Sequence, residues 1–228
     1  MKYLIWDFDG TLGYRTGGWS KACVDVVKET TTVSDVDIND IRPHLQSGFP
    51  WQSPDQPHPE ISTADEWWTQ LYPVFTKAIE STGVPPERAC EVAKQVRPMY
   101  LENDWQVFDD TISTLSRLSS EGWVHLILSN HVPELESILG ELGLTKYITE
   151  TYVSAKLGYE KPHPEAFRPV ISDLDDEATA WMLGDSYRAD VKGAETVGIP
   201  AVLVRNTHPG ADYCCETLDK VDNVLSDY

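Results

Sequence analysis

The sequence predicts a doubly wound α/β fold with a mostly parallel sheet, into which a helical domain is inserted. Three observations predict it. An apolar run near the N-terminus suits a strand buried on both faces, helix and strand patterns alternate from about residue 112 onward, and the stretch between them shows helical patterns alone. We therefore expect a core domain of residues 1–15 and 103–228 and a helical domain of residues 16–102; with 41% hydrophobic residues the chain can bury a sizeable core.

The expected core elements follow one another in a regular order. The first strand, residues 2–8, is a continuous apolar run that leads into an Asp-Gly-Thr turn. Gly143 and Gly198 mark helix ends, because glycine readily adopts the left-handed conformation that closes a helix. The remaining expected elements are a helix over 112–120, a strand over 123–129, a helix over 133–142, a strand over 148–154, a helix over 164–172, a strand over 178–183, a helix over 189–197 and a strand over 199–204.

The inserted stretch breaks this alternation. Its helical patterns cover about residues 21–29, 64–81 and 86–101. A proline-rich segment, residues 49–59, lies between the first two and is expected to be a loop.

The charge balance restricts the partners. The chain has 37 acidic and 18 basic residues, and its net charge of −19 would repel a phosphate backbone, so no nucleic-acid partner is expected. An acidic surface favours solubility and would also suit a high-salt cytoplasm. A site for an anionic substrate in such a protein must supply its own local positive charge.

The sequence predicts a cytoplasmic protein with no membrane partner, either a monomer or a homodimer. No stretch approaches the roughly 20 apolar residues of a bilayer span, and the N-terminal apolar run is too short for a signal peptide. The cysteines lack CxxC spacing and include a vicinal pair, so reduced thiols are expected at Cys23, Cys90, Cys214 and Cys215.

Two carboxylates lie at the end of the first expected strand. Asp7 and Asp9 are two residues apart, so their side chains project to the same side and can share one cation. Gly10 lets the chain turn away while its backbone approaches an anion, and Thr11 follows it. In isolation, a surface Asp-x-Asp-Gly turn is the alternative interpretation.

Two further strand ends carry polar groups. Ser129 and Asn130 end the strand over 123–129 just before a helix, where a hydroxyl and free N–H groups can cradle a phosphate; an ordinary helix N-cap is the alternative. Lys161 precedes Pro162 in another strand-to-helix connection of the same sheet. There it could neutralise a transferring phosphoryl group, although a lone loop lysine is usually solvated.

A last pair of acids follows the strand over 178–183. Asp185 would lie at the strand tip as a hard oxygen ligand of the kind that Mg²⁺ prefers. Asp190 begins the next helix, where an acid is also favoured by the helix dipole. For Asp190 we favour orientation of Lys161 or of a metal-bound water over direct metal binding.

These four elements resemble the motifs of the haloacid dehalogenase (HAD) superfamily in their order and in their placement at strand ends. The resemblance covers nearly all of the part of the chain that is expected to form the sheet. Residues 7–11 resemble its DxDGT motif, Ser129 its small hydroxylic residue and Lys161 its basic residue. Residues 184–190 resemble its acidic motif, here GDxxxxD with Asp185 and Asp190. A helical insert directly after the first motif resembles the family's cap domain. The resemblance implies a Rossmann-like HAD core, residues 1–15 and 103–228, with a helical cap domain, residues 16–102.

The resemblance also implies a function: a Mg²⁺-dependent phosphatase that hydrolyses a small phosphorylated metabolite. Asp7 would become an aspartyl-phosphate, while Asp9 would protonate the leaving oxygen and then activate water. Mg²⁺ would be held by Asp7, the Asp9 backbone carbonyl and Asp185. Ser129, Asn130 and Lys161 would bind the phosphate, with Gly10, Thr11 and Asp190 in support.

Three alternatives stay open at this point. A phosphomutase would use the same four elements. A dehalogenase of the superfamily is disfavoured because family dehalogenases lack an acid at the position of Asp9. A non-catalytic binding module would usually have lost a nucleophile or a metal acid, and none is missing.

The insert offers weaker indications about the substrate. Arg15, just past the first motif, is the best candidate for substrate contact, although Trp residues at helical spacing are more often core residues. His58, between two prolines, is expected to be a rigid loop residue rather than a metal ligand. The other candidates are Arg42, His44, Trp51, Trp67 and Trp68.

Overall fold

The structure, a computed structural model, describes residues 1–61, 63–102 and 104–225. The chain divides into two compact units. Unit 1 comprises Met1–Tyr14, Pro54–Glu60 and Gln106–Tyr228, and unit 2 comprises Arg15–Ser53 and Ile61–Trp105. Within the described residues, no helix is both long and apolar enough to cross a membrane.

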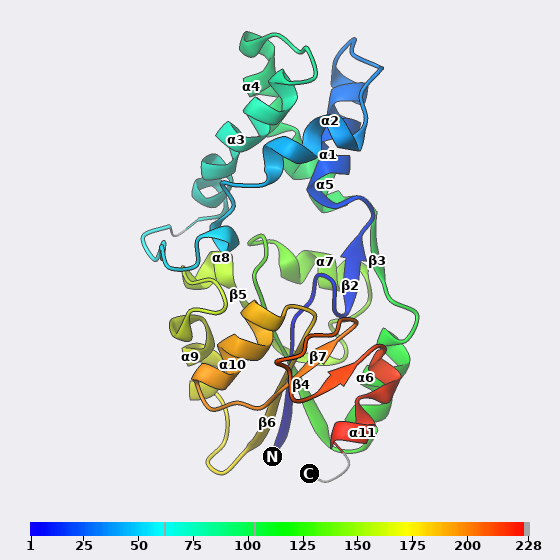
Figure 1. The fold of residues 1–228 in the computed structure, drawn as a ribbon, viewed down its shortest axis with the longest axis vertical. Helices are drawn as coiled ribbons and strands as arrows, with labels where there is room; N and C mark the ends of the chain where they lie inside the picture. The colour runs from blue at the N-terminus through cyan, green and yellow to red at the C-terminus, as the bar shows by residue number, and fades with distance from the viewer. Residues whose placement is uncertain (62, 103, 226–228) are drawn as a thin grey trace. The chain divides into compact units, whose positions relative to one another are not determined.

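Unit 1 is built on a six-stranded sheet of order β5-β4-β1-β6-β7-β8, in which every strand pair is parallel (Figure 1). The predicted α/β fold with a parallel sheet is therefore confirmed. The strands are β1 (Lys2–Trp6), β4 (Trp123–Ser129), β5 (Ile148–Val153), β6 (Thr179–Gly184), β7 (Ala201–Val204) and β8 (Cys214–Cys215).

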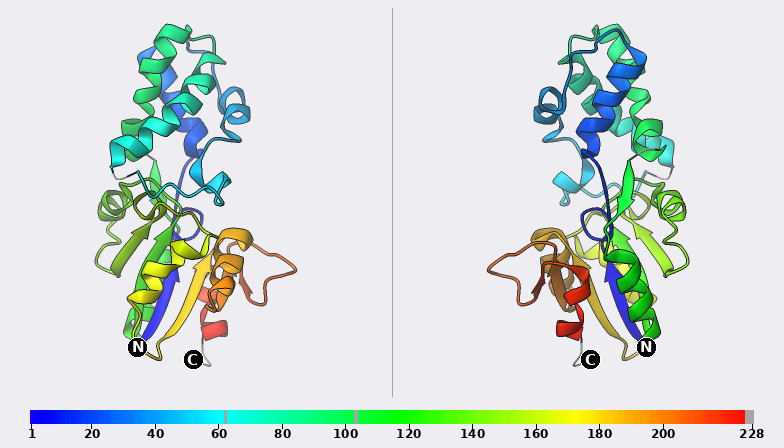
Figure 2. Two further views of the ribbon diagram at one scale, coloured as in Figure 1. Left: turned by 90° about the vertical axis from the view of Figure 1, so that its left-hand side faces the viewer. Right: turned by 90° about the vertical axis from the view of Figure 1, so that its right-hand side faces the viewer.

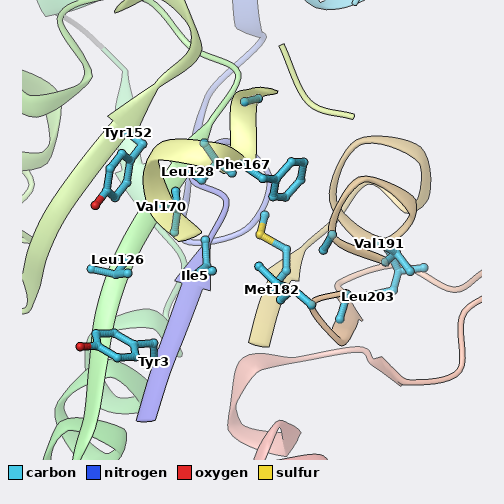
Figure 3. Packing of buried hydrophobic residues seen from close by; sticks show 14 residues of the cluster. Tyr3, Ile5, Leu126, Leu128, Tyr152, Phe167, Val170, Met182, Val191 and Leu203 are labelled. Carbon is cyan, nitrogen blue, oxygen red and sulfur yellow. The ribbon is translucent and has the colours of Figure 1, made fainter. Parts of the chain in front are cut away.

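The central strand β1 is buried on both faces, as its apolar run predicts. Leu4, Ile5 and Trp6 have no exposed surface. Ile5 belongs to the apolar cluster under the helices α9 (Pro164–Ser172) and α10 (Gly193–Thr196) (Figure 3). Trp6 points the other way and donates from Nε1 to Nδ1 of His125 at 2.9 Å.

Helices cover both faces of this sheet (Figure 2). The helices α9 and α10 lie on one face, and α6 (Thr111–Ser120) and α11 (Asp222–Leu225) lie on the other. The unit also contains α7 (Leu135–Glu141), α8 (Ser154–Leu157), the wide π-type turn η3 (Tyr187–Lys192) and the 3₁₀ turn η4 (Leu218–Lys220).

Unit 2 is helical and packs around aromatic rings. Trp67, Trp68 and Phe75 of α3 have no exposed surface, and the ring of Trp19 stacks on Tyr100 with centroids 3.6 Å apart. The Thr63 hydroxyl caps the start of α3 by accepting from the Glu66 amide. The elements are α1 (Gly18–Thr30), α2 (Ile38–Ile41), η1 (Arg42–Leu45), η2 (Pro50–Gln52), α3 (Ala64–Glu80), α4 (Pro86–Lys94) and α5 (Val96–Glu102).

The chain passes between the units along a two-stranded sheet of β2 (Gly13–Arg15) and β3 (Trp105–Val107). It passes between them again on either side of Pro54–Glu60, a segment inside the predicted 16–102 insert that belongs to unit 1. This segment is held there by His58, whose amide donates to the Gly158 carbonyl at 2.8 Å.

Some expected elements differ from the observed ones. The helix expected over 86–101 is two helices, because the Gln95 amide bonds back to the carbonyls of Val92 and Ala93 and closes α4. The helix expected over 189–197 is η3 followed by α10. Ser154 begins α8 instead of ending a strand, and the two-residue strand β8 was not expected.

Candidate active site

The carboxyl ends of β1, β4 and β6 bring the predicted site residues to one edge of the sheet in unit 1. Asp7 directly follows β1, and its amide donates to the carbonyl of Leu183 in β6 at 2.9 Å. Ser129 is the last residue of β4, and Asp185 directly follows β6. Parallel strands end at the same edge, which explains why residues far apart in sequence meet here.

A tight turn follows Asp7. The Phe8 carbonyl accepts hydrogen bonds from the amides of Thr11, Leu12 and Gly13 at 3.1, 2.9 and 3.1 Å. Gly10 has φ 85°, and a Cβ there would lie 2.6 Å from Oδ2 of Asp185. Glycine is therefore required at this position both for the left-handed backbone and for the space taken by Asp185.

Lys161 is the buried cation of the site. Its side chain is 1% exposed, and Nζ lies 2.6 Å from Oδ1 of Asp190 and 3.0 Å from Oδ1 of Asp7. Nζ also donates to the Leu128 carbonyl at 2.7 Å. Burial acts to lower the pKa of Lys161, but the charges and hydrogen bonds of Asp190 and Asp7 outweigh it and raise the pKa.

The backbone of Lys161 is clamped by a side-chain amide. Asn130 donates from Nδ2 to the Lys161 carbonyl at 2.9 Å and accepts from the Lys161 amide on Oδ1 at 2.7 Å. The Asn130 side chain thus orients Lys161, and phosphate binding by the Asn130 backbone stays a prediction. Beside it, the Ser129 hydroxyl is buried without a hydrogen-bond partner.

The pKa values of two further carboxylates, Asp185 and Asp9, are raised. The pKa of Asp185 is raised to about 6. Burial is the largest cause, and the charge of Asp7 is the next. The crowding of protein around Asp9, with the charge of Asp7, raises the Asp9 pKa to about 7. The side chain of Asp9 is exposed, so solvent moderates this desolvation, but both causes act in the same direction.

The donor set suits a hard divalent cation. One oxygen from each of Asp7, Asp185 and Asp190 lies within 4.8 Å of the others. Both oxygens of Asp190 are already used, by Lys161 and by the Ser186 amide at 2.9 Å. Asp7 and Asp185 are therefore better placed to bind a cation directly. A bound cation would offset the repulsion between these two carboxylates.

The candidate substrate-contacting residues of the insert differ in their surroundings. The Arg15 guanidinium is buried in unit 2 and donates to the carbonyls of Gly18, Met99 and Tyr100. Arg15 is therefore engaged in holding helix ends together, which does not support its predicted contact with substrate. Trp67 and Trp68 are core residues; Trp51 and His44 are half-buried, and Arg42 is exposed.

Two contacts near the site were not expected from the sequence. The Arg205 guanidinium bonds to the Thr11 carbonyl at 2.7 Å, across 194 residues of sequence. Nε2 of His58 lies 3.2 Å from Oε1 of Glu160, the residue before Lys161. A lone arginine and a lone histidine carry no motif, so the sequence held no signal for either contact.

The sequence is similar to those of known hydrolases. The sequence profile of the haloacid dehalogenase-like hydrolases matches residues 1–198. The chain is 28% identical over 222 residues to the mouse haloacid dehalogenase-like hydrolase domain-containing protein 3, covering 92% of this chain and 84% of that protein. Matches to the bovine and human proteins of the same name span 59% and 57% of their lengths.

A second relative and a solved structure are also similar. The chain is 34% identical over 175 residues to a ribulose-1,5-bisphosphate 5-phosphatase of Halopiger xanaduensis, covering 69% of this chain and 73% of that protein. The HAD-hydrolase YfnB of Bacillus subtilis, solved bound to magnesium, has the same fold, with a TM-score of 0.76, 19% identity and 99% and 98% of the two chains covered. The chain therefore belongs to the haloacid dehalogenase-like hydrolases.

Proposed function

We propose that the protein is a Mg²⁺-dependent phosphatase that hydrolyses a phosphate monoester of a small metabolite. The observation that carries the proposal is the cluster of Lys161 with Asp7, Asp185 and Asp190, next to the unpartnered Ser129 hydroxyl. In an acidic protein, Lys161 together with a Mg²⁺ bound by these carboxylates would supply the local positive charge that an anionic phosphate needs, and the Ser129 hydroxyl would supply a free donor.

In the proposed first step, a carboxylate oxygen of Asp7 attacks the phosphorus and the ester bond breaks. Asp9 gives its proton to the leaving oxygen, and the desolvation and the charge of Asp7 that raise its pKa favour the protonated form needed for this step. The alcohol leaves, and the phosphoryl group stays on Asp7 as an aspartyl-phosphate. Lys161 and the Ser129 hydroxyl bind the phosphoryl oxygens through the transfer.

In the second step, Asp9, now a carboxylate, takes a proton from water, which attacks the phosphorus and releases phosphate from Asp7. Asp7 and Asp185, with the Asp9 carbonyl, would hold Mg²⁺, which when bound offsets the repulsion between the Asp7 carboxylate and the phosphate. Asp190 and Asn130 act on Lys161, through its ammonium and its backbone respectively.

The two units suggest a division of labour. We propose that unit 1 carries the chemistry and that unit 2 forms a cap that selects the substrate; these units correspond to the predicted core of residues 1–15 and 103–228 and cap of residues 16–102, except that Pro54–Glu60 belongs to unit 1 and Arg15 and residues 104–105 to unit 2. Because the Halopiger relative is named a ribulose-1,5-bisphosphate 5-phosphatase, a sugar phosphate is a reasonable first compound to test.

The test is hydrolysis of p-nitrophenyl phosphate with and without EDTA, by the wild type and by Asp7→Asn. We expect turnover that EDTA abolishes and Mg²⁺ restores, and a loss of roughly 10³-fold or more in Asp7→Asn, since an amide of the same size cannot attack phosphorus. Asp173→Asn is the matched control, because Asp173 pairs with the Tyr152 hydroxyl away from the site. Appreciable activity in Asp7→Asn would refute the nucleophile assignment.

A wider screen addresses the alternatives. Ribulose 1,5-bisphosphate and other sugar phosphates should be tested for phosphate release. Absence of Mg²⁺-dependent turnover on all esters would favour a non-catalytic binding module instead.

A further inference from the structure

Arg205 lies at the carboxyl end of β7, outside every motif of the predicted site. It has φ 59°, a left-handed conformation that is uncommon for any residue other than glycine. Its amide donates to the Cys215 carbonyl at 2.8 Å, which holds this backbone against β8. A conformation of this kind persists only where the surroundings enforce it, and it directs the side chain back toward the turn after β1.

The guanidinium joins two groups. Nε donates to the Thr11 carbonyl at 2.7 Å. Nη2 and Nη1 donate to the two carboxylate oxygens of Asp110 at 2.6 and 3.3 Å. The guanidinium carbon lies 3.7 Å from the ring centroid of Phe108, so one face of the planar group is also packed.

Asp110 is itself held firmly. Its Oδ2 accepts from the Leu218 amide at 2.8 Å. Burial would raise its pKa, but the hydrogen bonds from Arg205 and Leu218 bring the pKa below its ordinary value. Asp110 is therefore a charged group at the start of α6, and the Leu218 amide holds it in place independently of Arg205.

The turn on the other side of Arg205 carries the proposed chemistry. Thr11 is two residues from Asp9, and its hydroxyl lies 3.4 Å from Oδ1 of Asp185. The next carbonyl, that of Leu12, accepts from the Thr111 hydroxyl at 2.7 Å. Successive carbonyls of the turn are thus bonded to Arg205 and to the first turn of α6.

We propose that Arg205 is a positioning residue for Asp9: its guanidinium ties the Thr11 carbonyl to the Asp110 carboxylate and so fixes the turn that aims Asp9 at the leaving oxygen. Only arginine has a rigid fork that bonds a carboxylate with two N–H groups and a carbonyl with a third. The inference rests on the proposed phosphatase function and goes beyond it, because no motif includes Arg205.

The leaving group provides a readout that a merely structural role would not move. p-Nitrophenolate leaves with little need for a proton, whereas phenolate, of nearly the same shape, needs one. If Arg205 acts through Asp9, Arg205→Met should lower kcat/KM for phenyl phosphate by about 100-fold and for p-nitrophenyl phosphate by about 10-fold or less. Asp9→Asn is the benchmark and should show the same preference more strongly.

Two variants define the requirement. Arg205→Lys keeps the charge but cannot bond Thr11 and Asp110 together, so it should show most of the selective loss. Arg117→Met is the matched control, because Arg117 pairs with Glu121 and Asp222 at a distance from the motifs, and it should leave both rates unchanged. An equal loss on both substrates, or full activity in Arg205→Lys, would overturn the inference.

Amide hydrogen exchange separates this inference from the proposed function. In the protein without substrate, the amides of Thr11, Leu12 and Gly13 should exchange at least 10-fold faster in Arg205→Met and Arg205→Lys than in wild type, and Arg117→Met should not change them. Unchanged exchange would overturn the positioning role even if the enzyme is a phosphatase. Faster exchange in a protein that hydrolyses no ester would support the positioning of the turn and refute the phosphatase.

Discussion

At the residue scale, the site is defined by one buried cation among several carboxylates. Lys161 neutralises part of the charge of Asp7 and Asp190, whereas no ion pair to Asp185 is found among the residues that the structure describes. Removing carboxylates from water without a full set of partners raises their pKa values. Burial and the charge of Asp7 together raise the pKa of Asp185 to about 6.

This charge predicts how Mg²⁺ binding depends on pH. Because the pKa of Asp185 is raised to about 6, its protonated form accumulates below that pH and competes with the metal. The Mg²⁺ dissociation constant, measured by calorimetry, should rise about 10-fold between pH 7 and pH 5. Asp185→Asn should weaken binding at pH 7 and remove most of this dependence, and Asp173→Asn should do neither. A constant affinity across this range would refute Asp185 as a ligand.

At the element scale, the strand β6 and the turn η3 meet so closely that only glycine fits between them. A Cβ at Gly184 would lie 2.1 Å from Oδ2 of Asp190 and 2.2 Å from its Cγ. The π-type turn η3 places this carboxylate over the end of β6, where it contacts Lys161. The geometry of η3 therefore determines where the Lys161 ammonium is held.

Gly184→Ala should displace the Asp190 carboxylate from Lys161. We expect a loss of about 1–3 kcal/mol in the free energy of unfolding, from overpacking, together with reduced kcat. The control is Gly140→Ala in α7, where a Cβ meets nothing within 4 Å; it should stabilise the protein by about 0.4–1 kcal/mol. Urea unfolding and phosphatase assays on both variants test the contrast, and equal behaviour would contradict it.

The segment Pro54–Glu60 belongs to unit 1, although the residues on either side of it in the sequence belong to unit 2. His58 is 6% exposed and pairs with Glu160, and a Cβ at Gly158 would lie 2.5 Å from Cα of Pro59. The segment thus lies directly against the loop that leads to Lys161. Its position depends on contacts across more than 100 residues of sequence, since His58 and Glu160 are 102 residues apart.

His58→Ala should release this segment. The Glu160 carboxylate, 2% exposed, would lose its partner, and we expect the free energy of unfolding to fall by about 1–3 kcal/mol. Limited proteolysis should then cut within residues 54–60 faster than in the wild type, in which His58 is buried. His44→Ala, at a half-buried histidine of η1, is the control and should change neither result. Resistance to proteolysis in His58→Ala would show that other contacts hold the segment.

At the scale of the whole molecule, the net charge of −19 acts on stability through self-repulsion. Added KCl should raise Tm, and most of the rise should occur below about 0.3 M, because the Debye length has already fallen from about 30 Å at 0.01 M to about 10 Å at 0.1 M. Differential scanning calorimetry across a KCl series measures this. A rise that begins only at molar salt would point to a cosolute effect in place of screening.

The fold and most of the site could be predicted from the sequence because both depend on local patterns. Alternating apolar segments determined the parallel sheet, and polar residues after strands identified Asp7, Ser129, Lys161 and Asp185, since parallel strands end at one edge. The tertiary structure alone decided which side chains are partners: Asn130 with the Lys161 backbone, His58 with Glu160, and Arg205 with Thr11. These contacts join residues 31 to 194 positions apart, and their directions are set by packing, which no local pattern encodes.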